Sequence, residues 1–318
     1  MSASSLALAS AAKTSGLPLL ETQRCAYLPA DLPPPAGAAK EVADRLTVPV
    51  HINGKGPYRF IVDTGADRTV LATEVGMELG LVHGARVLLN GVVQSRITDT
   101  VAIRHLAFGS SASGNFSVPT IPRSLLDADG YLGLDFLDGH RVTFDFKGGL
   151  LQVSESRPKF SADWTRPSEA RIHTFGSSGH LRSLDCRVDG VSTAAFVDSG
   201  AEVSAANAPL LDALSRRNPS FGVVGDMELI DITGGQIQGK VVMVKQIRLP
   251  GLAFDECPLV IANFQVFKAW GLTRAPALLI GMNVLRQFSR VSIDYRLKEL
   301  RFDLASSSAG SASRDSTA

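Results

Sequence analysis

The sequence predicts an all-β protein built from two related halves. A short acidic motif occurs twice, at 60–66 and 195–201, and each copy begins with three apolar residues that lead into an aspartate. A later apolar segment containing glycine also occurs twice, at 131–137 and 279–285, in the same order after the motif. The runs between them are short, rich in β-branched residues and separated by turn residues. Matching order with unequal spacing is what duplication followed by loop divergence leaves.

Composition divides the chain into five segments. The two ends and a central stretch are rich in proline, glycine, serine or alanine and cannot supply a core. Between them lie two blocks of similar length with β-type patterning. The predicted segments are a flexible leader (1–44), a first lobe (45–153), a linker (154–183), a second lobe (184–304) and a disordered tail (305–318).

Each block begins with a predicted hairpin whose second strand leads into the acidic motif. The turns are Asn53-Gly54 in the first block and Asp189-Gly190 in the second, flanked by apolar runs. A short helix is expected after each motif, and then another hairpin. The helices are predicted around 73–79 and 208–216, and the later hairpins over 86–103 and 226–249.

Composition excludes several function classes. Lys plus Arg number 32 and Asp plus Glu number 31, for a net charge of +1, so no basic footprint for nucleic acid is present. The three cysteines, at 25, 186 and 257, are scattered without a C-x-x-C pair. We therefore expect no disulfide framework, no metal site and no cofactor, although one cysteine pair could still bridge.

The sequence leaves the compartment open. No apolar run approaches the roughly 20 residues that span a bilayer, so no membrane span is expected. The opening stretch lacks the basic region and long apolar core of a secretory signal. The protein is expected to be soluble, either cytoplasmic or exported with a weak or trimmed signal.

The acidic motif has a physical logic. An apolar strand followed by a tight turn places Asp63, and in the second copy Asp198, at the end of a buried strand. The glycine two residues later permits a close approach that a Cβ would block. The hydroxyl residue between them can hydrogen-bond locally and hold the turn. A single such motif is typical of a surface turn, whereas two matched copies indicate a shared site.

Two carboxylates held close together suit peptide hydrolysis without a metal. They cannot both ionise cheaply, so they share one proton over a wide pH range and titrate as a unit. One carboxylate takes a proton from a water molecule while the other donates to the scissile carbonyl oxygen. The sequence does not assign separate acid and base roles to Asp63 and Asp198.

The segment 61–71 resembles the active-site segment of retroviral-type (retropepsin) aspartic proteases, and 278–285 resembles a later segment of that family. Those proteins are normally homodimers with one catalytic Asp per subunit. This chain resembles two such halves fused in the pepsin arrangement, as in bacterial retropepsin-like aspartyl proteases. The resemblance covers about 46–304 and implies a pseudodimer of β-barrel lobes, related by a pseudo-two-fold axis, with a cleft between them.

The resemblance also implies residue roles. It makes Asp63 and Asp198 the catalytic pair, and assigns a supporting role to the hydroxyl and glycine residues beside them. Substrate-cleft positions follow in the same turns and in a hairpin flap, for which 226–249 is the better candidate. The supporting residues are Thr64, Gly65, Ser199 and Gly200, and the cleft residues are Ala66, Asp67, Ala201, Glu202, Gly234 and Gly235.

The chain departs from the family pattern at two points. Leu134 and Met282 stand where the retroviral enzymes have arginine, which removes a supporting ion pair. The second motif continues with smaller residues over 201–206 than the first, so the second half is the more diverged. Both copies keep the aspartate and the glycine.

We expect an aspartic endopeptidase that acts on protein or peptide substrates as a monomer. The alternative is a catalytically inactive module that keeps the protease fold for binding or regulation. The sequence has no H-E-x-x-H zinc helix and no G-x-S-x-G elbow that would favour another hydrolase. An obligate homodimer is a further alternative, and residues 1–44 are expected to cover the cleft until they are removed.

Overall fold

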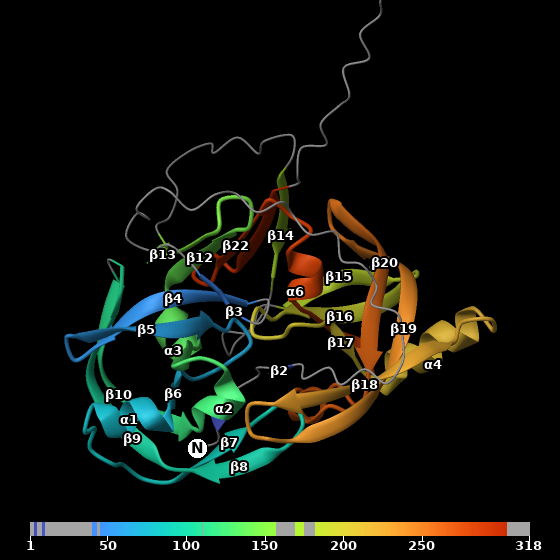
Figure 1. The fold of residues 1–318 in the computed structure, drawn as a ribbon. Coiled ribbons are helices and arrows are strands. Elements are labelled where there is room, and N and C mark those ends of the chain that lie inside the picture. Colours follow the sequence, from blue (N-terminus) through green and yellow to red (C-terminus); the bar gives the residue numbers. More distant parts are fainter. Residues whose placement is uncertain are drawn as a thin grey trace, which may run out of the picture.

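The computed structural model is mostly β, with 53% strand and 14% helix, as predicted (Figure 1). It describes residues 3–4, 8–9, 40–42, 45–109, 111–156, 169–174 and 182–303. Two barrels lie side by side in Figure 1, the first in blue and green and the second in yellow and orange.

The first lobe is a closed barrel of six strands. The strands run in the order β4-β5-β11-β6-β10-β9, and pairing of β4 with β9 closes the ring. Two pairings are parallel, β5 with β11 and β6 with β10. The bounds are β4 (Arg45–Ile52), β5 (Lys55–Val62), β6 (Val70–Ala72), β9 (Thr100–Phe108), β10 (Ser111–Ile121) and β11 (Gly130–Leu132).

The second lobe repeats this barrel. Its order is β15-β16-β21-β17-β20-β19, closed by pairing of β15 with β19. Each strand matches one of the first lobe in order and direction, which confirms the duplicated fold. The bounds are β15 (Arg182–Val188), β16 (Val191–Val197), β17 (Ala205–Ala206), β19 (Gln236–Leu249), β20 (Leu252–Ile261) and β21 (Ala277–Ile280).

The predicted helices and hairpins are present in both lobes. Helices α1 (Thr73–Glu78) and α4 (Ala208–Arg217) follow the acidic motifs. The later hairpin is β7 (Val87–Asn90) with β8 (Ser95–Thr98) in the first lobe, and β18 (Val223–Asp231) with β19 in the second. The remaining short helices also come in matched pairs: α2 (Arg123–Leu126) with α5 (Gln265–Ala269), and α3 (Leu134–Leu137) with α6 (Met282–Leu285).

A five-stranded antiparallel sheet joins the lobes, in the order β13-β12-β22-β23-β14. Its centre pairs β12 of the first lobe with β22 of the second. The five strands are β12 (His140–Asp145), β13 (Leu150–Glu155), β14 (Glu169–His173), β22 (Arg290–Asp294) and β23 (Glu299–Asp303). One apolar core cluster runs from both barrels into this sheet, and it includes Val142 and Ile293.

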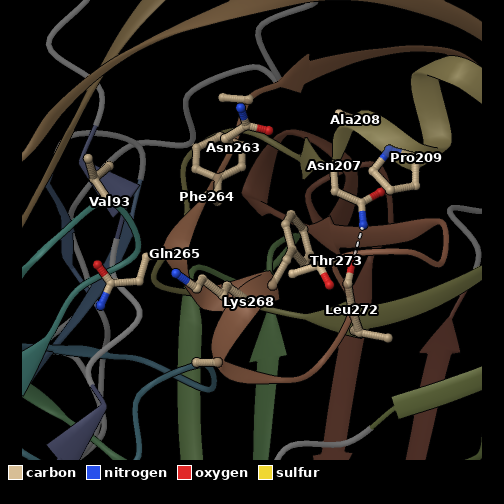
Figure 2. Close-up of a pocket in the computed structure, with 13 residues that line it drawn as sticks. Val93, Asn207, Ala208, Pro209, Asn263, Phe264, Gln265, Lys268, Leu272 and Thr273 are labelled. Carbon is tan, nitrogen blue, oxygen red and sulfur yellow. Dashed lines mark hydrogen bonds between the residues drawn. The ribbon is translucent and has the colours of Figure 1, made fainter.

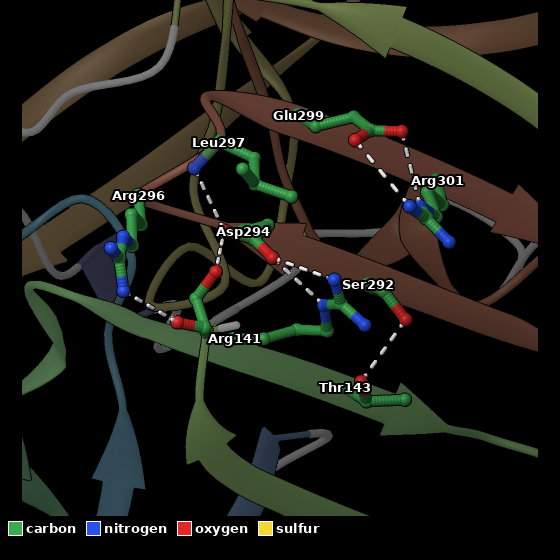
Figure 3. A network of polar contacts seen from close by, with 9 residues as sticks. Arg141, Thr143, Ser292, Asp294, Arg296, Leu297, Glu299 and Arg301 are labelled. Carbon is green, nitrogen blue, oxygen red and sulfur yellow. Dashed lines mark hydrogen bonds and ion pairs between the residues drawn. The ribbon is translucent and has the colours of Figure 1, made fainter. Parts of the chain in front are cut away.

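Reciprocal ion pairs cross the centre of this sheet. Arg141 of β12 pairs with Asp294 of β22 at 2.8 Å, and Arg290 of β22 pairs with Asp145 of β12 at 2.8 Å. The hydroxyls of Thr143 and Ser292 meet between these pairs at 3.0 Å (Figure 3). Each strand carries arginine and aspartate four positions apart, so the antiparallel register places each arginine opposite the other strand's aspartate.

Several strands lie inside the segments predicted as leader and linker. Strands β1 (Ala3–Ser4), β2 (Leu8–Ala9) and β3 (Lys40–Val42) fall within 1–44, and β14 falls within 154–183. The predicted tail, 305–318, lies outside the described residues, as does Cys25. Among the residues that are described, Cys186 and Cys257 are free and buried.

Candidate active site

The two predicted catalytic aspartates emerge from equivalent strands. Strand β5 is exposed over its first half and buried over its last three residues, and β16 is buried over its last five, so each delivers the next residue to the interior. The backbone N–H of Asp63 donates to Leu132 O at 3.0 Å, and that of Asp198 donates to Ile280 O at 3.0 Å. Both aspartates are fully buried.

Each carboxylate is held by its own turn. The backbone N–H of Gly65 donates to Asp63 Oδ1 at 2.9 Å. The backbone N–H of Gly200 donates to Asp198 Oδ1, also at 2.9 Å. The two carboxylates are therefore fixed in the same way at equivalent positions of the two lobes.

The two turns interlock across the lobes. A Cβ added to Gly65 would lie 2.6 Å from Asp198 Cγ, and one added to Gly200 would lie 2.5 Å from Asp63 Cγ. Each glycine is therefore packed against the carboxylate of the other lobe. Neither glycine has a positive φ, so the close approach, rather than backbone strain, requires glycine. The structure thus brings the two aspartates together.

The hydroxyl residues lock the turns together beneath the aspartates. Thr64 Oγ1 donates to Val197 O at 3.2 Å, and Ser199 Oγ donates to Val62 O at 2.7 Å. Each hydroxyl also accepts from the backbone N–H of the other residue, at 2.9 and 3.1 Å. Four hydrogen bonds therefore cross between the lobes at one buried point, and the supporting role of Thr64 and Ser199 in catalysis stays a prediction.

Burial and charge favour a protonated carboxyl group in this pair. Burial raises the pKa of Asp198 well above its usual range, and the neighbouring charge of Asp63 raises it further. The backbone N–H groups of Gly200 and Ala201 act in the opposite direction, since they favour the ionised form. The arrangement can therefore hold a proton at a pH at which an exposed aspartate is ionised.

A tyrosine that was not predicted from the sequence lies close to the pair. Tyr295 is buried, and burial, followed by the charge of Asp63, raises its pKa well above the ordinary value. The signal was present in the repeat, because the matched position of the first half is Phe146. Such a difference between otherwise equivalent positions marks a polar group that only one lobe carries.

The four predicted cleft positions in the turns also cap helices. The carbonyls of Ala66 and Ala201 accept from the N–H groups that begin α3 and α6, both at 2.8 Å. The carbonyls of Asp67 and Glu202 accept from the following N–H groups, at 3.2 and 3.1 Å. Ala66 and Ala201 are fully buried, and Asp67 and Glu202 are half-buried. These residues thus bind each turn to the glycine segment that repeats later in the sequence.

Another matched pair supports the turns, and no role was predicted for it from the sequence. Asp135 Oδ1 accepts from Thr69 N at 2.8 Å and from Thr69 Oγ1 at 2.6 Å. In the second lobe Asn283 Oδ1 accepts from Ser204 N at 2.9 Å and from Ser204 Oγ at 2.7 Å. A carboxylate and an amide can therefore occupy equivalent positions, because holding the turn requires only one acceptor oxygen.

Gly234 and Gly235 lie where the two later hairpins meet, rather than beside the aspartates. A Cβ on Gly235 would lie 2.7 Å from Gln94 Cγ of the first-lobe hairpin. Gly234 has a φ of +83°, which forms the turn between β18 and β19. Their role toward a substrate stays a prediction, and the contact brings in a first-lobe hairpin that was not predicted as part of the flap.

Both hairpins carry a strand from the segment predicted as leader. Strand β1 pairs in parallel with β7, with Ala3 opposite Leu89. Strand β2 pairs antiparallel with β18, with Leu8 opposite Asp231. An extended peptide that crosses a pseudo-two-fold axis must run parallel to one hairpin and antiparallel to its counterpart, and the two pairings have this arrangement.

A cavity of about 830 Å³ lies beside the tip of the β7–β8 hairpin (Figure 2). It is bounded by the start of α4, by α5 and the residues before it, and by Val93 at the tip of the β7–β8 hairpin. None of the predicted catalytic or cleft residues lines it.

Two other findings bear on the predicted site. Within the described part of the chain, no group of three or more His, Cys, Asp or Glu side chains is placed to hold a metal ion. Among the same residues, no helix has the length and apolar character needed to cross a membrane.

The chain is similar, over part of its length, to two known proteins. It is 27% identical over 133 residues to DNA damage-inducible protein 1 of Kluyveromyces lactis, a match over 39% of this chain and 30% of that relative's length. The solved retropepsin-like aspartic protease of Rickettsia conorii matches 43% of this chain and 90% of its own, at 17% identity and a TM-score of 0.30.

The family model for aspartyl proteases matches two segments, residues 48–136 and 184–284, which together make up more than half of the chain. Each segment contains one of the two acidic motifs, one closed barrel and one half of the interlocked turns. The chain therefore belongs to the aspartyl protease family, with both matched lobes in one polypeptide.

Proposed function

We propose that the protein is an aspartic endopeptidase whose catalytic pair is Asp63 and Asp198. The observation that carries this proposal is the burial of the two carboxylates against each other's glycine, each held through Oδ1 by its own turn. The raised pKa of Asp198 supports a pair that keeps one proton. Family membership supports a protein or peptide as the substrate.

The chemistry follows from the shared proton. The ionised carboxylate takes a proton from a water molecule, and the water oxygen bonds to the scissile carbonyl carbon. The protonated carboxyl group donates its proton to the carbonyl oxygen at the same time. The C–N bond then breaks, with proton transfer to the leaving amine, and the pair returns to its starting state with one proton.

The test is cleavage of a diverse peptide mixture from acidic to neutral pH, with Asp63→Asn and Asp198→Asn measured beside the parent. We expect cleavage by the parent and none by either variant. Cleavage that persists in both variants would place the active site elsewhere. Intact peptides in every sample, including protein without its leader, would favour the inactive binding module.

We also propose that the leader, 1–44, covers the site until it is removed. The pairing of β1 with β7 and of β2 with β18 supports this, because both hairpin edges are then taken by the protein's own chain. Deletion of residues 1–39 retains β3 with its partner β4 and is the appropriate variant. We expect peptide cleavage to rise on deletion, and unchanged cleavage would remove the proposal.

We further propose that the active form is a monomer, since one chain supplies both aspartates. Peptidase activity per molecule should then stay constant on dilution. Loss of activity on dilution, together with a dimer mass at the active concentration, would contradict it.

A further inference from the structure

Asp231, at the end of β18, lies at the contact between the two later hairpins. It is fully buried, yet it carries a carboxylate far along the chain from the catalytic pair. A buried carboxylate needs hydrogen-bond donors around it, and here donors come from both lobes. The mechanism proposed above makes no use of this group.

One carboxylate oxygen organises its own hairpin. Asp231 Oδ1 accepts from the backbone N–H and the hydroxyl of Thr233, at 2.9 and 2.5 Å, and from the backbone N–H of Gly235 at 2.9 Å. These bonds fix the turn between β18 and β19. They leave Oδ2 pointing away from that turn.

The other oxygen binds the hairpin of the first lobe. Asp231 Oδ2 accepts from the backbone N–H groups of Val93, at 2.8 Å, and Gln94, at 3.3 Å. Gly91 fits closely against it, because a Cβ at that position would overlap Oδ2. Gly91 has no positive φ, so space, not backbone conformation, excludes a side chain there.

The tip of the first-lobe hairpin is also seated in the second lobe. Val92 is fully buried in an apolar cluster whose other members, among the described residues, all belong to the second lobe. That cluster includes Ala201, three residues after Asp198. The carbonyl of Val92 accepts from the N–H of Gln265 at the start of α5, at 2.7 Å, and Gln265 lies beside Val93 in Figure 2. The hairpin tip is thus tied toward one of the catalytic turns.

We propose that Asp231 is a latch that joins the two hairpins into one closed unit over the substrate, and so acts as a positioning residue. Because its five hydrogen bonds are all accepted, the site requires an acceptor on both oxygens. The same hairpin edges, β7 and β18, pair with extended segments of this chain, so fixing them relative to each other fixes where a peptide strand can pair. The catalytic consequence rests on the proposed peptidase function.

Two variants test the latch, one with a substitution in each lobe. Asp231→Asn keeps the size of the side chain but replaces one acceptor oxygen with an NH₂ group. That group then faces the N–H donors of one of the two hairpins. Gly91→Ala keeps every hydrogen-bonding group and inserts a methyl group against Oδ2. Matched controls are Asp226→Asn, an exposed aspartate of the same strand that pairs with Lys240, and Gly222→Ala, whose Cβ meets nothing within 4 Å.

The first readout is amide hydrogen exchange in the protein without substrate, which does not depend on catalysis. We expect exchange at 91–95 and 231–235 to rise at least tenfold in both latch variants, with barrel strands unchanged and both controls like the parent. Unchanged exchange at 91–95 in Asp231→Asn would overturn the latch whether or not the protein cleaves peptides.

The second readout is steady-state peptide cleavage. Both latch variants should raise KM by about tenfold while kcat changes less than threefold, because the hairpins position substrate and do not touch the reacting atoms. A fall in kcat with KM unchanged would contradict a positioning role. Increased exchange at the hairpins in protein that cleaves no peptide would support the latch and count against the proposed function alone.

Discussion

The two lobes have the same structural contacts at equivalent positions, but some of these contacts are made by different residues. At the catalytic turns, where residues of one lobe contact the other, both lobes have an aspartate and a glycine. The glycine of each lobe packs against the carboxylate of the other. Where a group serves only its own lobe, the copies differ, as Asp135 and Asn283 do. Contacts across the pseudo-two-fold axis tolerate less change, because each residue must fit a partner that also repeats.

The reciprocal ion pairs give a second comparison. Arg141–Asp294 and Arg290–Asp145 are the same pair on opposite sides of the axis, each at 2.8 Å. Their surroundings differ, since the side chain of Asp294 is 3% exposed and that of Asp145 is 20% exposed. Asp294 Oδ1 also accepts from Ser156 Oγ. It accepts from Leu297 N as well (Figure 3). The two ion pairs thus have the same length but differ in burial and in the further hydrogen bonds that each aspartate accepts.

The largest effect is expected from the catalytic pair. Asp198→Asn should lower kcat by a factor of about a thousand or more, since it removes a reacting group. Its raised pKa means that the buried aspartate destabilises the fold once pH rises toward the folded-state pKa. The variant should therefore be more stable than the parent at neutral pH, by about 1.4 kcal/mol for every factor of ten by which folding weakens the acid.

The measurement is thermal unfolding of parent and variant from pH 3 to pH 7. The stability difference should shrink as pH falls below the folded-state pKa and should be lost below the unfolded-state pKa, near the ordinary value of 3.8, because Asp198 is then protonated in both states. If Asp198→Asn loses stability relative to the parent as pH rises from 3 to 7, the raised pKa of Asp198 is contradicted.

The ion pairs should show the next largest difference. Asp294→Ala removes the partner of a mostly buried arginine together with two further acceptor contacts, and we expect it to cost about 3 kcal/mol. Asp145→Ala opens a more exposed pair and should cost about 1 kcal/mol. Chemical denaturation of both variants measures this difference. Equal costs would mean that neither the burial of the Arg141–Asp294 pair nor the additional contacts of Asp294 contribute to stability.

The hydroxyl lock predicts a smaller effect with an internal control. Thr64→Ser should change stability by less than about 1 kcal/mol, since Ser199 makes the equivalent bonds in the other lobe. Thr64→Ala loses both hydroxyl bonds and should cost about 2 kcal/mol, with a matching loss of peptidase activity. Chemical denaturation and peptide cleavage are measured for both variants. If Thr64→Ser loses as much stability and activity as Thr64→Ala, the methyl group of Thr64 matters more than its hydroxyl.

The smallest effect is expected from exchanging the acceptors that differ between the lobes. Burial of its carboxyl group raises the pKa of Asp135, although the residue as a whole is exposed to solvent. Asp135→Asn should therefore stabilise slightly at neutral pH, by up to about 0.5 kcal/mol after solvent screening, and be neutral in acid. Asn283→Asp should do the reverse. Thermal unfolding at two pH values tests both, and a large loss in Asp135→Asn would mean that the charge itself is required.

Much of the fold followed from the sequence because it is repeated. The hairpin turns at Asn53 and Asp189, the helix near 208–216 and the two acidic strands were all predicted from short-range patterns, and the structure has them. Repetition strengthened each weak local signal, since the same pattern at matched positions has one simple explanation. Asp63 and Asp198 were identified in the same way, and their catalytic role stays a prediction.

Other features depend on contacts that no local pattern records. Asp231 reads as an ordinary turn residue, and its second oxygen finds partners only because the hairpin of the other lobe folds against it. The roles of Asp294 and of Tyr295 likewise depend on the register between β12 and β22 and on the position of the catalytic turns.

The sequence by itself determined the duplication, the β architecture and the two acidic turns, because strand patterning and turn chemistry act over a few neighbouring residues. The tertiary structure decided which oxygen meets which donor, how deeply each ion pair is buried and how the two hairpins are joined. These properties arise between segments more than a hundred residues apart, where burial and distance, rather than residue type, set the strength of an interaction.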